Sequence, residues 1–178
     1  MKKISLLLIV SLFIFSACNN KTKEKKDESK TSSKKEILNK IKKTEKEVFD
    51  VPPEKINPSK ANILAEYYIE YAAFGDSLAP EYLYKATGIL MNTGNPRKAV
   101  KAINEILEKY PEFDKTENCY FLRAFVYDDK IKDTSRAGQY YRDYLKRYPD
   151  GDFAPDAKLL LKNMGKSTEE IFKELEKK

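Results

Sequence analysis

Apolar side chains recur every three or four residues over most of the chain, and one such stretch returns after 38 residues. The first copy is residues 95–111, NPRKAVKAINEILEKYP, and the second is residues 134–149, TSRAGQYYRDYLKRYP. This spacing collects apolar side chains on one face of an α-helix, and the proline that closes each copy ends the helix. Each copy therefore predicts one amphipathic helix with a defined end.

The residues before each copy repeat with the same period, so the predicted unit is a pair of helices. Four matched positions carry Tyr82, Leu83, Ala86 and Ile89 in the first unit and Tyr120, Phe121, Ala124 and Tyr127 in the second. Small residues also open the second helix of each unit, at Ala99 and Ala137. We expect these alanines to lie where helices touch, because a small side chain lets two helices approach closely.

The order of these positions resembles that of the tetratricopeptide repeat family. The matching residues are Ala86, Ala99, Ile103 and Pro111 in the first unit, and Ala124, Ala137, Tyr141 and Pro149 in the second. The period of 38 exceeds the usual 34 or so, which predicts longer turns, and Lys85 and Arg123 stand where the family usually has leucine. The resemblance implies an all-α, right-handed helical-hairpin solenoid of about two full units, with flanking half-units and a C-terminal capping helix.

Weaker patterns flank the two units. Ser33 and Glu36 have the spacing of a capping box, and a helix is predicted to follow them and to end before Pro52-Pro53. Its thin apolar stripe leaves open whether it packs on the repeats: Ile37, Leu38, Ile41, Val48 and Phe49. Asn57-Pro58 anticipates Asn95-Pro96 by 38 residues, and both pairs predict a helix start, the first for a helix over residues 58–74.

The C-terminal part predicts two short helices. The first spans residues 153–164 and stops at Gly165, and the second begins at a capping box made by Ser167 and Glu170. The whole pattern predicts about eight helices in one folded domain, residues 34–178, with its core repeats at about 58–164.

The first residues have the pattern of an export signal. Two lysines precede an apolar run over residues 4–15, which is shorter than a membrane-spanning helix and ends at Phe15-Ser16-Ala17-Cys18. The last three residues resemble the lipobox of bacterial lipoproteins, which implies removal of residues 1–17 and acylation of Cys18. An ordinary signal peptide with an incidental cysteine is the alternative. The expected location is the bacterial cell envelope, lipid-anchored, with the outer membrane favoured.

The segment after Cys18 is lysine-rich and contains no large apolar residue, so residues 18–33 are predicted to be a disordered tether. The nine lysines and four acidic residues before Ile37 account for five of the six net positive charges of the chain. The folded part is therefore nearly neutral, which argues against nucleic-acid binding.

Candidate chemistry is sparse. The absence of histidine excludes histidine bases, histidine metal ligands and nucleophiles activated by histidine. Cys119 is predicted to be a buried, inert thiol, and the pairs Asp128-Asp129 and Asp150/Asp152 are assigned to caps and turns. We therefore predict a protein that is not an enzyme and has no metal site and no cofactor.

The predicted binding site rests on a second stripe in the first helix of each unit. Because the family resemblance implies that this stripe lines the partner-binding groove, the candidate residues are Leu83, Thr87 and Leu90 in the first unit and Phe121, Phe125 and Asp128 in the second. Tyr140 is added as an exposed tyrosine, because it replaces the small Ala102, whereas Tyr141, Tyr144 and Tyr148 are assigned to packing. The alternative for Phe121 and Phe125 is burial against the neighbouring unit.

These features predict a lipid-anchored scaffold or adaptor that binds other proteins of the cell envelope and takes part in assembly of the envelope or of the outer membrane. The alternative function is capture of a small ligand or glycan in the repeat groove.

Overall fold

The computed structural model describes residues 20–167, 169–170 and 173, and every regular element among them is helical. The α-helices in this part of the chain are α1 (Asn20–Phe49), α2 (Pro58–Ala72), α3 (Ala79–Asn92), α4 (Pro96–Lys109), α5 (Thr116–Phe125), α6 (Thr134–Arg147) and α7 (Ala154–Asn163). A 3-10 turn, η1 (Pro53–Lys55), precedes α2, and a π-helical segment, η2 (Val126–Ile131), extends α5. The predicted all-α fold is confirmed.

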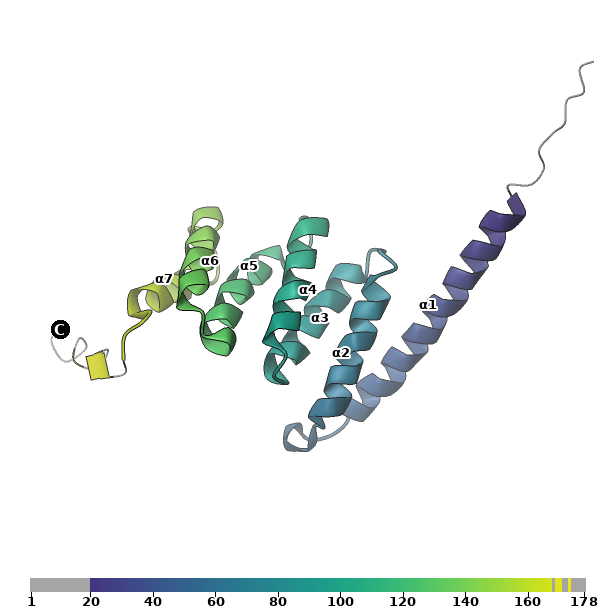
Figure 1. The fold of residues 1–178 in the computed structure, drawn as a ribbon, viewed down its shortest axis with the longest axis horizontal. Helices are drawn as coiled ribbons and strands as arrows, with labels where there is room; N and C mark the ends of the chain where they lie inside the picture. The colour runs from purple at the N-terminus through teal and green to yellow at the C-terminus, as the bar shows by residue number, and fades with distance from the viewer. Residues whose placement is uncertain (1–19, 168, 171–172, 174–178) are drawn as a thin grey trace, which may run out of the picture.

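Each helix packs mainly against the helix before it and the helix after it. Successive antiparallel pairs therefore stack into an elongated array, with α2, α4 and α6 on one face and α3 and α5 behind them (Figure 1). This arrangement is a helical-hairpin repeat of the tetratricopeptide type, as the 38-residue period predicts. The connections at residues 110–115 and 148–153 are six residues long, in agreement with the longer turns expected from that period.

The starts of α2 and α4 differ in how their first backbone N–H groups are capped. Asn57 caps α2, because its side-chain oxygen accepts hydrogen bonds from the backbone N–H groups of Ser59 and Lys60, at 2.9 and 3.1 Å. Asn95 precedes α4 in the same sequence context, but its side chain makes no cap hydrogen bond. Its amide instead donates to the side chain of Asn62 on α2. The second predicted asparagine cap is therefore wrong in its hydrogen bonding, although α4 begins where expected.

The N-terminal segment differs from its prediction. Helix α1 begins at Asn20, so residues 20–33 are helical and do not form a disordered tether, and Ser33 lies inside the helix and not at its start. Lysine and glutamate dominate this segment and both have high helix propensity. The helix therefore continues without a break beyond its packed part, and it projects from the array (Figure 1).

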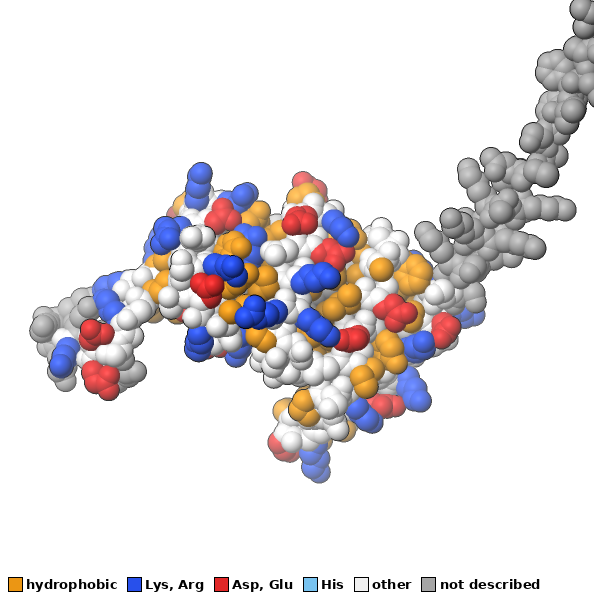
Figure 2. All heavy atoms as spheres, viewed as in Figure 1, with side chains coloured by type: hydrophobic (Ala, Val, Ile, Leu, Met, Phe, Trp, Pro, Cys, Tyr) orange, Lys and Arg blue, Asp and Glu red, His pale blue; other side chains and the backbone are white. Residues whose placement is uncertain are grey.

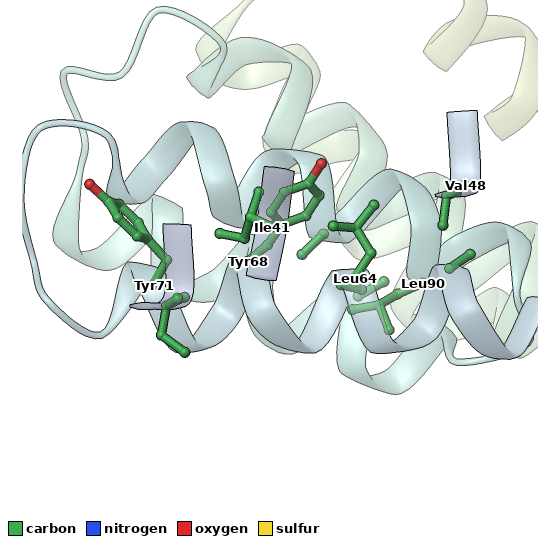
Figure 3. Packing of buried hydrophobic residues seen from close by; sticks show 11 residues of the cluster. Ile41, Val48, Leu64, Tyr68, Tyr71 and Leu90 are labelled. Atoms are coloured by element: carbon green, nitrogen blue, oxygen red, sulfur yellow. The ribbon is translucent and has the colours of Figure 1, made fainter. Parts of the chain in front are cut away.

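The packed part of α1 forms the first layer of the core. Ile41 and Val48 are each 1% exposed and belong to one cluster with Leu64, Tyr68 and Leu90. Figure 3 shows these side chains converging from α1, α2 and α3. The sequence left open whether this helix packs on the repeats, and the structure shows that it does. The predicted apolar stripe of α1 extends one residue too far, however, because Phe49 at its end is 54% exposed.

The matched alanines lie in helix contacts as predicted. Ala86, Ala99, Ala124 and Ala137 are each fully buried. Tyr141 and Tyr144 are fully buried too, which confirms their assignment to packing, and Tyr148 is half-buried beside Tyr144.

The C-terminal signals are also present in the described residues. Helix α7 ends just before Gly165, whose φ of +79° is the left-handed conformation that glycine adopts most readily. The capping box is formed by two reciprocal hydrogen bonds between Ser167 and Glu170, of 2.7 and 3.2 Å. Most of the last predicted helix, the signal sequence and Cys18 lie outside the described residues.

Candidate partner-binding groove

The residues predicted to line the binding groove on α3 are in the core. Leu83, Thr87 and Leu90 are each at most 1% exposed, and the Thr87 hydroxyl donates to the carbonyl oxygen of Leu83 within the helix, at 3.0 Å. Helix α3 packs against both α2 and α4. The stripe of Leu83, Thr87 and Leu90 is therefore covered, as is the stripe that contains Ala86. The expected accessibility to a partner is therefore wrong for Thr87 and Leu90, whereas Leu83, although 1% exposed, contributes to the lining of a groove between α2 and α4.

The equivalent residues on α5 and η2 are divided between core and surface. Phe121 is 9% exposed, and its ring stacks on Phe153 with centroids 4.6 Å apart, so the alternative of burial is correct for it. Phe125 and Asp128 are half-buried, and Asp128 accepts a long hydrogen bond from the hydroxyl of Tyr141, at 3.4 Å. A binding role for Phe125 and Asp128 stays a prediction.

Tyr140 is less accessible than expected. The Arg123 guanidinium lies 4.2 Å from the centroid of its ring, and the ring of Tyr127 lies 5.2 Å away. These neighbours leave Tyr140 half-buried. The predicted site residues therefore do not form one continuous exposed surface.

A different groove is open between α1 and α3, above α2. It has a volume of about 570 Å³, and we call it the α1–α3 groove. Most of its lining is apolar, and its residues are Glu45, Val48, Phe49, Ile56, Ala61, Tyr68, Lys85, Gly88, Ile89, Asn92 and Thr93. Phe49 is 54% exposed at its edge, although its place in the α1 stripe predicts burial. An exposed aromatic ring beside an apolar groove is a typical feature of protein-binding surfaces.

Gly88 keeps the groove open. It lies within α3, where glycine costs about 1 kcal/mol relative to alanine. A Cβ atom built at Gly88 would have no neighbour within 4 Å, so close packing does not explain the glycine. The absence of a side chain here leaves space in the groove that any larger residue would occupy.

One end of the groove carries a charged cluster. The hydroxyl of Tyr68 donates to Glu45 Oε1 at 2.7 Å, and the Lys85 ammonium lies 3.6 Å from the same oxygen. Lys85 also lies 5.7 Å from the centroid of the Tyr68 ring. Burial, assisted by Glu45, raises the pKa of Tyr68 well above its ordinary value. Tyr68 is therefore a hydroxyl donor at all physiological pH values, and it orients the carboxylate.

The other end carries a neutral hydrogen-bond network. Asn62 Oδ1 accepts from the Thr93 hydroxyl at 2.6 Å and from the Asn95 amide at 2.9 Å. Thr93 lines the groove, and this network fixes the turn between α3 and α4 against α2. The groove thus has rigid polar ends and an apolar centre, which suits a peptide segment with an apolar side chain between polar groups.

The remaining residues considered for chemistry are one cysteine and two pairs of aspartates. Cys119 is fully buried, and burial raises its pKa from 9.0 to about 12, so the thiol is protonated at neutral pH, which confirms the prediction of a buried thiol. The described residues contain no group of three potential metal ligands. Asp129 pairs with Lys130 at 2.8 Å, but Asp128 and Asp129 lie within the helical segment η2, so their assignment to a cap or turn is wrong. Asp152 lies in the turn before α7, as predicted.

Two sequence features could have indicated the α1–α3 groove. Lys85 stands where the related family usually has leucine, and Gly88 interrupts an otherwise regular helix. The position of Phe49 has no comparable signal, because its exposure depends on where α1 ends relative to α3.

Comparison with known families agrees with the repeat pattern. The model described as "Tetratricopeptide repeat" matches residues 81–112 and 118–151. No curated protein and no solved structure matches the chain. None of the described helices has the length and apolar character needed to cross a membrane. The matched segments coincide with the hairpins α3/α4 and α5/α6, so these two hairpins are similar to tetratricopeptide repeats.

Proposed function

We propose that this protein is a lipid-anchored scaffold of the bacterial cell envelope that holds a segment of a protein partner in the α1–α3 groove. Tetratricopeptide repeats generally mediate protein–protein interaction and are typically not enzymes. The observation that carries the proposal is the open apolar space above Gly88, bordered by the exposed ring of Phe49. It accommodates one large apolar side chain of an extended peptide.

The anchor is proposed from the sequence Phe15-Ser16-Ala17-Cys18. Two or more acyl chains on Cys18 give stable membrane binding, whereas one chain gives marginal binding. Cys18→Ser is expected to abolish labelling by a radioactive fatty acid and to leave uncut precursor or soluble protein. Unchanged labelling of this variant contradicts the anchor and leaves the groove unaffected.

The groove is tested with Gly88→Leu. The new side chain projects into space that is empty in the structure, so it blocks the groove without overpacking the core. Envelope proteins are crosslinked to the wild-type chain and to the variant, and the purified complexes are analysed by mass spectrometry. We expect a discrete protein partner with the wild type and at least a tenfold lower yield with Gly88→Leu, roughly 1.4 kcal/mol of binding free energy.

The matched control is Gln139→Leu, which adds the same side chain at an exposed position of α6. It is expected to keep the partner. Loss of the partner in both variants, or in neither, contradicts the assignment to the α1–α3 groove. Recovery of a small ligand or glycan without any protein partner supports the alternative function of ligand capture.

A further inference from the structure

A second groove lies between α2 and α4, on the face that also carries α6. It has a volume of about 520 Å³, and we call it the α2–α4 furrow. Its apolar residues include Ile63, which is 48% exposed, and Ala102, and its polar edges include Glu66 and Glu105. Figure 2 shows acidic, basic and apolar side chains interspersed over this face. The furrow shares no lining residue with the α1–α3 groove.

The next furrow along the array, between α4 and α6, is filled by the chain itself. Arg123 of α5 reaches into it, and its guanidinium contacts Asn104 Oδ1 of α4 at 3.4 Å and Asp143 Oδ2 of α6 at 3.1 Å. The same guanidinium stacks on the ring of Tyr140 of α6, 4.2 Å from its centroid. Only 14% of the Arg123 side chain is exposed. An arginine enclosed by an aromatic ring, a carboxylate and an amide is thus the occupant of this furrow.

The 38-residue repeat places equivalent positions around the α2–α4 furrow. Asn104 corresponds to Glu66 on α2, and Asp143 corresponds to Glu105 on α4. Tyr140 corresponds to Ala102, so the large ring is replaced by a methyl group. The α2–α4 furrow therefore has two carboxylates at positions where the α4–α6 furrow has one. It also has free volume where the α4–α6 furrow has the ring of Tyr140.

The arginine itself has no equivalent in this furrow. Its counterpart Lys85 points toward α1 instead, where it lies 3.6 Å from Glu45 and 5.5 Å from the centroid of the Tyr82 ring. Tyr67 lines the α2–α4 furrow and supplies an aromatic ring there. The α2–α4 furrow consequently has side chains suited to binding an arginine, but it lacks the arginine that occupies the α4–α6 furrow.

We propose that the α2–α4 furrow binds an arginine side chain of a protein partner between Glu66 and Glu105, as the neighbouring furrow holds Arg123. A guanidinium is planar and has five N–H donors, so it bonds two carboxylates at once while its apolar stem covers Ile63 and Tyr67. The site is independent of the α1–α3 groove and adds a second contact for a partner.

Both carboxylates have lysine neighbours that an incoming arginine displaces at low cost. Glu66 pairs with Lys98 at 2.5 Å, and these side chains are 61% and 57% exposed. Glu105, whose side chain is 27% exposed, pairs at 2.7 Å with Lys109, which is 61% exposed. Exposed ion pairs of this kind contribute little to stability, because water and salt screen them.

The test uses the ¹⁵N-labelled full chain and the peptide acetyl-Leu-Arg-Leu-amide as the probe. We expect peptide-dependent shifts of the backbone amide signals of residues 63–70 and 98–105 in nuclear magnetic resonance spectra. Replacing the arginine by citrulline, which is neutral and of the same shape, is expected to raise the dissociation constant at least about tenfold, since charge-assisted hydrogen bonds are lost.

The double variant Glu66→Gln, Glu105→Gln is expected to weaken the arginine peptide by a similar factor. Its matched control is Glu54→Gln, Asp156→Asn, which removes the same charge from exposed positions outside the furrow and is expected to bind as the wild type does. Shifts that map elsewhere, equal binding of the citrulline peptide, or equal loss in both double variants overturn the proposal. Because the furrow variants leave Gly88 and Phe49 unchanged, failure here is distinguishable from failure of the proposed function.

Discussion

Gly151 lies where three side chains meet, in the turn between α6 and α7. A Cβ atom there would lie 2.6 Å from the Tyr144 hydroxyl and 2.9 Å from the Cβ of Tyr148, both well inside normal contact distance, and it would clash with Glu117 as well. Glu117 Oε1 accepts hydrogen bonds from the Tyr144 hydroxyl at 2.7 Å and from the backbone N–H of Asp152 at 2.8 Å. The glycine therefore allows α5, α6 and the turn to share one carboxylate.

We predict that Gly151→Ala lowers the free energy of unfolding by about 1–3 kcal/mol, as overpacking of a tight contact usually does. Urea denaturation monitored by circular dichroism gives the value. Gly88→Ala is the control, since its Cβ meets open space inside a helix, and it is expected to raise stability by about 0.5–1 kcal/mol. Equal signs for the two substitutions contradict this account.

Cys119 gives a second prediction for a single side chain. Because burial holds its pKa at about 12, the thiol is protonated and inaccessible in the folded protein. In a Cys18→Ser background, which leaves one thiol, iodoacetamide at pH 8 is expected to modify Cys119 only as fast as the protein unfolds. The rate should rise steeply at the urea concentration where helicity is lost. Rapid modification of the native protein contradicts the buried position of this cysteine.

Among the elements, α5 depends on close contact with α6. Ala124 of α5 and Ala137 of α6 are both fully buried in one cluster. We predict that Ala124→Leu lowers the free energy of unfolding by about 1–3 kcal/mol, because the larger side chain pushes the helices apart. Lys101→Ala, at an exposed position of α4, should stay within about 0.5 kcal/mol of the wild type. Comparable losses at both positions would show that the assigned register is wrong.

At the scale of the whole molecule, contacts run almost entirely between neighbouring helices. Within the part of the chain that the structure describes, the buried hydrophobic side chains form three clusters, the first around α1, α2 and α3 and the third around α5, α6 and α7. The free energy of unfolding of such an array is roughly a sum of local terms. A substitution at one end therefore destabilises the neighbouring helices more than the distant ones. The long π-extended α5 lies between the second and third clusters, with Cys119 and Val126 in the former and Phe121 in the latter.

We predict that Ile41→Ala destabilises the N-terminal end selectively. Removing this fully buried side chain costs about 2–5 kcal/mol locally. Amide hydrogen exchange should become faster in α2 and α3 and remain nearly unchanged in α6. Leu159→Ala on α7, where the side chain is 56% exposed, is expected to change exchange in none of these helices. A uniform acceleration along the chain would mean that the array unfolds as a single cooperative unit.

Local patterns were sufficient for the architecture. The three-and-four spacing of apolar residues, the proline signals and the 38-residue period predict helices α2 to α7, their pairing and the buried alanines, which the structure confirms. The start of α1 and the side-chain cap at Asn95 differ from the prediction. The confirmed features depend on neighbours within a few residues in the chain or on one repeated contact. The same reasoning identified Tyr141 and Tyr144 as core residues.

Only the tertiary structure decided which side chains remain accessible. Leu83 and Phe49 both belong to apolar stripes, yet Leu83 is buried in one cluster with residues of α4, whereas Phe49 is 54% exposed at the edge of the α1–α3 groove. The direction of the Arg123 side chain likewise could not be predicted from the sequence, although the repeat places Arg123 at the equivalent of Lys85. Exposure depends on side chains that come from distant parts of the chain, so a single helical pattern does not determine it.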